Sequence, residues 1–135
     1  MDRFFLRNVS GISLVELLWG LGLPVVIDST FLPLFMRRLG ASNLLVGLVP
    51  TLISAGVAVA SLLAYRLTAR MRRKKGVLVA VHVVTALPLF IFGLLVIGRG
   101  IRPSTLGSFL GAYSAFSLAL GLLLPVWQNY IVKIF

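Results

Sequence analysis

Four long apolar stretches divide the chain and decide which class of fold it can adopt. They cover residues 11–36, 44–65, 77–98 and 105–126, and the second and fourth contain no charged residue. A helix needs about 20 predominantly apolar residues to cross the roughly 30 Å hydrocarbon core of a bilayer. None of the stretches alternates polar and apolar residues as a membrane β-barrel strand does. The sequence therefore predicts an all-α membrane protein, with one domain over residues 1–135 and four transmembrane helices.

The composition agrees with a membrane protein and leaves little material for catalysis. Only 12% of the 135 residues are charged, whereas about 25% of a soluble domain is, so the charges are too few to cover a water-facing surface. The chain has no Cys, one His and three acidic residues. A disulfide framework and a Cys-based metal site are therefore excluded. We expect no enzyme activity, no metal and no cofactor.

Basic residues lie between the apolar stretches and predict the topology. Nine Lys and Arg residues fall on the side that holds both chain ends and the segment between the second and third stretches, against four on the other side. Cytoplasmic segments of membrane proteins carry the excess of basic residues. We therefore predict that the N- and C-termini face the cytoplasm, in a multi-pass protein of the cell membrane that is surrounded by the lipid bilayer.

The densest basic run, LTARMRRKKG at 67–76, together with a formal net charge of +10, raises the alternative of a nucleic-acid patch. Because helices are predicted on both sides of this run, we interpret it as a short cytoplasmic loop that fixes the orientation of a helical hairpin, and we expect no nucleic-acid partner. Contact with anionic lipid headgroups is a further expectation. The basic residues of the loop are Arg66, Arg70, Arg72, Arg73, Lys74 and Lys75.

Three ionisable residues inside the predicted spans mark a candidate solute or proton pathway. A carboxylate at the bilayer centre is unfavourable by at least about 2.5 kcal/mol, so it usually faces a cavity or a partner. Asp28, which precedes Ser29 and Thr30, fits a polar cavity, and a purely structural carboxylate is the alternative. Glu16 and His82 both lie about five residues inside a predicted cytoplasmic helix end, which permits a proton relay if their helices touch. A structural histidine is the alternative for His82.

The fourth apolar stretch carries two further candidate features. Tyr113 stands in a polar patch that could contact a solute, and interhelical hydrogen bonding is the alternative. Gly107, Gly111 and Ala115 recur at every fourth position. Such a stripe of small residues lets another helix approach closely. We expect it to pack within the helical bundle, with a partner protein as the alternative.

Two segments of the chain resemble transporters of the major facilitator superfamily. The segment FLPLFMRRLGASNLLVGLVPTLISAG, residues 31–56, is similar to the first-helix exit and second-helix entry of these proteins, where the pattern LGAS…GL is frequent. The basic loop falls where the superfamily carries the motif G-x-x-x-D-R-x-G-R-R. Ser61 then stands for the first Gly, Tyr65 for the Asp, Arg66 for the Arg and Thr68 for the second Gly. Without the Asp, the usual charge pairing of the inner gate is in doubt here.

The resemblance implies a secondary transporter of a small solute, coupled to protons or ions, whose first and fourth helices line a central cavity. Asp28, Glu16 and Tyr113 become cavity candidates on that likeness. Since such transporters have about twelve helices in two halves, it also implies an N-terminal part whose remaining helices come from elsewhere. Two alternatives stay open: a complete dimeric transporter similar to small multidrug-resistance proteins, with Glu16 as the membrane carboxylate, and a non-transporting membrane subunit.

Overall fold

The computed structural model describes residues 3–27, 30–68 and 74–134, and these residues form five α-helices and no strand. The helices are α1 (Arg3–Ile27), α2 (Phe31–Arg38), α3 (Asn43–Thr68), α4 (Lys74–Arg99) and α5 (Thr105–Ile134). Four of them, α1, α3, α4 and α5, are long and apolar enough to cross a membrane. The prediction of an all-helical chain with four helices capable of spanning a membrane is confirmed.

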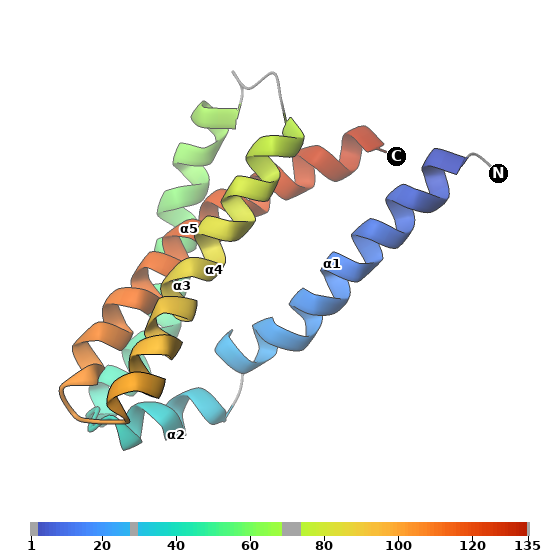
Figure 1. Cartoon of the computed structure of the whole chain (residues 1–135). Coiled ribbons are helices and arrows are strands. Elements are labelled where there is room, and N and C mark those ends of the chain that lie inside the picture. The colour runs from blue at the N-terminus through green and yellow to red at the C-terminus, as the bar shows by residue number, and fades with distance from the viewer. Residues whose placement is uncertain (1–2, 28–29, 69–73, 135) are drawn as a thin grey trace.

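The first predicted helix, 11–36, is wrong in one respect, because it contains two helices. Helix α1 ends at Ile27, and the short helix α2 begins at Phe31 and runs across the lower end of the molecule (Figure 1). Pro33 lies in the first turn of α2, where its missing N–H has no intrahelical acceptor to lose. At the other end, Gly40 has a φ of +85°, and the Ala41 N–H donates to the Met36 carbonyl at 3.0 Å. This left-handed glycine ends the helix, as at many helix C-termini.

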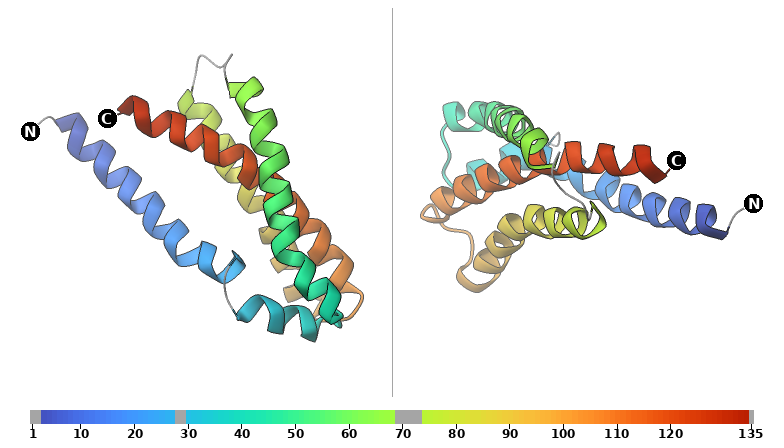
Figure 2. Two further views of the ribbon diagram at one scale, coloured as in Figure 1. Left: turned by 180° about the vertical axis from the view of Figure 1, so that it is seen from behind. Right: turned by 90° about the horizontal axis from the view of Figure 1, so that it is seen from above.

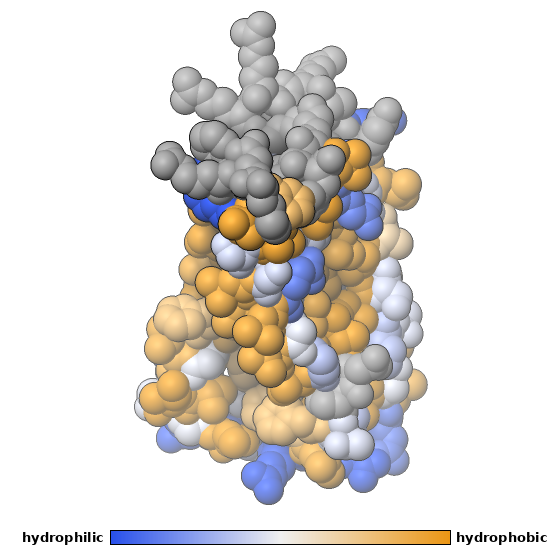
Figure 3. Space-filling view, turned by 90° about the vertical axis from the view of Figure 1, so that its right-hand side faces the viewer, coloured by the Kyte–Doolittle hydropathy of each residue, from blue (hydrophilic) through white to orange (hydrophobic). Residues whose placement is uncertain are grey.

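Helix α5 lies at the centre of the fold, and α1 stands to one side of it. Seen from above, α5 runs between α3 and α4 (Figure 2), and it makes the main helix contacts with both. Half of the most apolar 18-residue segment of α5 is buried, whereas no part of the corresponding segment of α1 is buried. The side of the molecule in Figure 3 is covered largely by apolar side chains, with hydrophilic ones at its lower end and others nearer its upper end. This distribution suits a bundle of α3, α4 and α5 surrounded by lipid.

The closest helix contact joins α3 and α5 and depends on two glycines. A Cβ atom added to Gly121 would lie 2.5 Å from the Val57 carbonyl oxygen, and one added to Gly56 would overlap Ser117 Oγ. By contrast, no atom lies within 4 Å of a Cβ added to Gly107 or Gly111. Helices in membranes approach closely where small residues remove bulk from the interface. Within this chain the close approach is therefore made at Gly56 and Gly121, and not at the predicted stripe.

A proline in α5 is compensated by a hydroxyl from α3. Pro125 has no N–H to donate to the carbonyl four residues before it, which is that of Gly121. The Ser61 hydroxyl of α3 donates to this carbonyl oxygen at 3.0 Å. In lipid an unpaired backbone carbonyl is strongly unfavourable, and a Ser or Thr from a neighbouring helix can satisfy it. The same crossing thus joins α3 and α5 by close packing and by a hydrogen bond.

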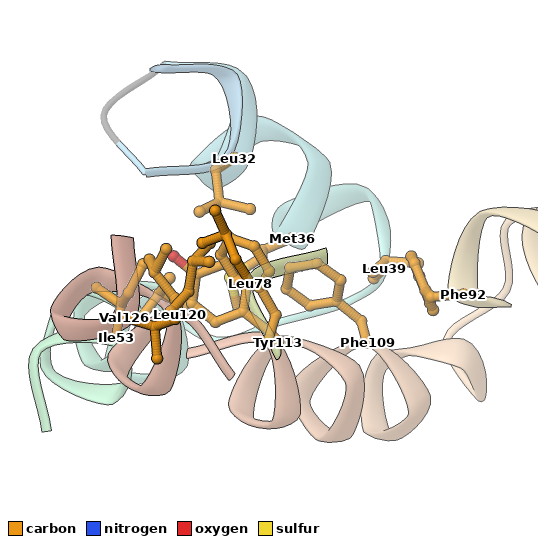
Figure 4. Packing of buried hydrophobic residues seen from close by; sticks show 13 residues of the cluster. Leu32, Met36, Leu39, Ile53, Leu78, Phe92, Phe109, Tyr113, Leu120 and Val126 are labelled. Carbon is orange, nitrogen blue, oxygen red and sulfur yellow. The ribbon is translucent and has the colours of Figure 1, made fainter. Parts of the chain in front are cut away.

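Helix α2 closes the lower end of the bundle with apolar side chains. Met36 and Leu39 are fully buried, and Leu32 is nearly so. Figure 4 shows Leu32 and Met36 reaching from α2 towards the ring of Tyr113 on α5. The Tyr113 hydroxyl donates to the Val26 carbonyl in the last turn of α1, at 3.1 Å. Carbonyls in a last turn lack intrahelical donors, so Tyr113 caps α1 and ties it to α5.

Candidate functional site

Side chains from α1, α4 and α5 enclose a cavity of about 240 Å³ on the side of the bundle that faces α1. Both tryptophans of the chain, its single histidine and one of its three acidic residues line this cavity. The remaining walls are leucines, and none of the lining residues in the described part of the chain is a Lys or an Arg. The lining residues are Glu16, Trp19, Leu23, His82, Leu120, Leu123, Leu124 and Trp127.

Glu16 is held in the cavity by an indole. The Trp127 Nε1–H of α5 donates to Glu16 Oε1 of α1 at 2.9 Å. A hydrogen bond to an ionised carboxylate is shorter and stronger than one between neutral groups. Because the donor is a neutral ring, Trp127 orients the carboxylate without neutralising its charge. The Glu16 side chain remains exposed enough to exchange a proton or meet a ligand.

His82 lies between the two tryptophans of the cavity and is half-buried. Its ring centroid is 5.9 Å from that of Trp19 and 5.7 Å from that of Trp127, and both pairs meet edge to face. His82 Nδ1 lies 2.8 Å from the Leu78 carbonyl oxygen. Since a carbonyl can only accept, we assign the proton to Nδ1. In the neutral ring Nε2 is then an acceptor, and among the described residues it has no hydrogen-bond partner.

The structure brings Glu16 and His82 to one cavity, as the sequence permitted, but does not join them directly. Trp127 contacts both, through its N–H on Glu16 and its ring edge on His82. Neither Trp127 nor Trp19 was among the pathway residues predicted from the sequence. Their spacing to Glu16 and His82 depends on how three helices are rotated, which periodicity within one helix does not reveal.

A second, more open hollow of about 410 Å³ continues from the cavity between α1 and α4. It shares Trp19, Leu23 and His82 with the cavity around Glu16, and extends to Ala86 and Leu89 on α4. Its walls are almost entirely apolar. The site therefore has a polar end at Glu16 and His82 and an apolar extension.

The structure describes one further predicted pathway residue, Tyr113, and it lies outside this cavity. Tyr113 is buried under α2 and caps α1 through Val26, so it has the interhelical hydrogen bond that the sequence left as the alternative. It is not among the residues that line the Glu16 cavity. Asp28 lies outside the described residues, and its role in a polar cavity remains a prediction.

The basic loop between α3 and α4 is described only at its edges. Arg66 near the end of α3 and Lys75 near the start of α4 are both exposed. The end of α3 and the start of α4 lie at the end of the molecule where α1 starts and α5 ends (Figure 1). The placement of Arg70, Arg72 and Arg73, and of the side chains of Tyr65 and Lys74, lies outside the described residues. Their expected roles in topology and gating stay predictions.

Comparison of the chain with protein-family models, with curated proteins and with solved structures finds no match. The resemblance to major facilitator transporters therefore depends on the quoted sequence motifs alone. What can be stated of the chain is that it has four helices able to span a membrane and a cavity that combines a carboxylate, an imidazole and two indoles.

Proposed function

We propose that the chain is part of a secondary active transporter of the major facilitator type, and that the cavity around Glu16 lies on its solute and proton pathway. The observation that carries this proposal is a carboxylate and an imidazole on one cavity among apolar helices. His82 and Trp127 lie seven and five residues inside the ends of the candidate spans Lys75–Arg99 and Thr105–Val132. At about 1.5 Å per residue this is a depth of about 8–10 Å. Ionisable groups inside a membrane commonly mark transport or proton pathways.

In this proposal Glu16 takes up and releases the coupling proton, and Trp127 positions its carboxylate. Two hydrogen bonds tie α1 to α5, one at Glu16 and one at the Val26 carbonyl. The contacts of α5 with α3 are far more extensive than those of α1 with its neighbours. A change in charge at Glu16 therefore acts on the helix that is least firmly packed. Such a helix can shift while α3, α4 and α5 stay together.

The outer face of α1 offers an apolar surface on which additional helices can pack. Leu14, Leu17, Leu21 and Val25 are all exposed on α1. Lipid can cover such a face, but a cavity bounded by one weakly packed helix does not by itself separate the two sides of a membrane. We propose that further transmembrane helices complete the pathway, either the remaining helices of a transporter of the major facilitator type or a second copy of this chain. A second copy corresponds to the dimeric alternative similar to small multidrug-resistance proteins.

The proposal is tested in proteoliposomes that contain the purified chain and a trapped pH indicator. Gradients of organic cations, organic anions and sugars are imposed in turn, first with the chain alone and then with any membrane protein that co-purifies with it. We expect at least one solute gradient to move protons, and this movement to be lost in Glu16→Gln. Activity of the chain alone favours the dimer, and activity only with a different polypeptide favours the divided transporter. Proton movement in neither preparation, or equal movement in Glu16→Gln, would refute the proposal.

A further inference from the structure

We infer that the solute recognised at the Glu16 cavity is a monovalent organic cation, an ammonium group on an apolar body. This inference rests on the proposed function, because it assigns a substrate class to the same cavity. It is carried by the charge, the aromatic walls and the shape of the site.

The charge of the cavity favours a cation. Among the lining residues that the structure describes, Glu16 is the only one that is negatively charged when ionised, and none is a Lys or an Arg. Its hydrogen-bond donor, the Trp127 indole, brings no positive charge. A bound cation is attracted to this carboxylate by the opposite charge and supplies the counter-charge that the indole does not. An anionic solute at the same place would be repelled, and a neutral one would leave the charge uncompensated.

The walls favour an organic cation over a metal ion. Hard divalent cations need about six oxygen ligands, and of the lining residues that the structure describes only Glu16 has a side-chain oxygen group. Trp19 and Trp127 offer indole rings instead, and cations bind over such rings within about 6 Å of the ring centre. The free Nε2 acceptor of His82 can in addition accept a hydrogen bond from an ammonium N–H.

The shape favours a cation that carries an apolar body. The cavity around Glu16, of about 240 Å³, opens into the apolar hollow of about 410 Å³ between α1 and α4. Trp19, Leu23 and His82 line both spaces, so one ligand can place its charge near Glu16 and its apolar part towards Leu89. A small hydrated cation would leave this hollow unused.

The chain contains its own probe for this inference, because its two tryptophans both line the cavity. Tryptophan fluorescence of the purified full chain in detergent is titrated with benzyltrimethylammonium. The matched control ligand is neopentylbenzene, which has the same shape with a carbon in place of the charged nitrogen. We expect a saturable change with the cation and none with the neutral compound. In Glu16→Gln the apparent Kd rises at least about tenfold, as for removal of one partner of a close charge pair.

Variants on α1 separate a lost charge from a disturbed helix. Glu16→Asp keeps the carboxylate, and we expect it to retain binding. Leu17→Gln introduces the same amide one residue away, at an exposed position outside the cavity, and we expect it to leave the Kd unchanged. Circular dichroism checks that the helix content of Glu16→Gln equals that of the wild type. Equal binding of neopentylbenzene, or an unchanged Kd in Glu16→Gln, would overturn the inference.

The two proposals fail separately. Saturable cation binding that depends on Glu16, without any solute-driven proton movement in proteoliposomes, would keep the cation site and reject transport. Proton movement driven by an anion or a sugar, with no cation binding, would reject the cation site and keep transport.

Discussion

Replacing Gly121 with alanine tests whether the contact of α5 with α3 holds the bundle together. The added Cβ would lie 2.5 Å from the Val57 carbonyl oxygen and 2.8 Å from the Val57 Cα, both backbone atoms that cannot rotate away. Ordinary contacts begin at 3.4 Å, so the two helices must separate locally by about 0.9 Å, the difference from 2.5 Å. The Ser61 hydrogen bond to the Gly121 carbonyl crosses the same contact and lengthens with it.

The expected net effect is a loss of about 1–2 kcal/mol in the free energy of unfolding. Overpacking of a tight contact is unfavourable by about 1–3 kcal/mol, and alanine recovers up to about 1 kcal/mol through its higher helix propensity. The matched control is Gly107→Ala on the same helix, where the added Cβ meets no atom within 4 Å. There only the propensity gain remains, so this variant is neutral or more stable by up to about 1 kcal/mol.

The assay is unfolding of each purified variant in dodecylmaltoside by added sodium dodecyl sulfate, followed by far-ultraviolet circular dichroism. Gly121→Ala should unfold at a lower fraction of the denaturing detergent than the wild type, and Gly107→Ala at an equal or higher fraction. If Gly121→Ala is as stable as Gly107→Ala, α3 and α5 do not approach each other as closely as we describe.

Two further predictions use the same chain. Ser61→Ala lowers the free energy of unfolding by about 1 kcal/mol, because it leaves the Gly121 carbonyl, which Pro125 cannot bind, without a donor. In a Pro125→Ala background the new N–H of residue 125 binds that carbonyl, so Ser61→Ala should cost less there. An equal loss of stability in both backgrounds would contradict the pairing. The chain has no Cys, so single-cysteine variants report topology directly: a membrane-impermeant thiol reagent added to intact cells should label Ser104→Cys and not Lys75→Cys, and the reverse pattern would overturn the predicted orientation.

The four helices able to span a membrane were predictable from sequence because length and apolarity alone decide whether a helix can cross a bilayer. The division of the first stretch into α1 and α2 was missed, since hydropathy stays high across it. Two signals were available: the polar residues at 28–30 and the ending of α2, with Arg37 and Arg38 followed by Gly40. Cationic residues in a last turn and a glycine after it are common signs of a helix C-terminus.

The helix contacts could not be read in the same way, because they depend on which faces meet. The stripe at Gly107 and Gly111 has the spacing of a packing motif, yet these residues are exposed. Gly121 lies outside that stripe, four residues after Ser117, and it approaches the Val57 backbone closely. Small residues permit close packing, but the neighbouring helix decides which of them is used.

The position of Glu16 shows why contacts between helices define depth better than residue counts do. Counted from the expected start at residue 11, Glu16 is five residues inside its helix, but the candidate span Phe5–Ile27 places it eleven residues from Phe5. The hydrogen bond from Trp127 places Glu16 at the same depth as Trp127, and Trp127 lies five residues inside the end of the span Thr105–Val132. A relation between Glu16 and His82 inferred from equal counts therefore had no secure basis in the sequence. It is the indole of Trp127, which contacts both side chains, that brings them to one cavity.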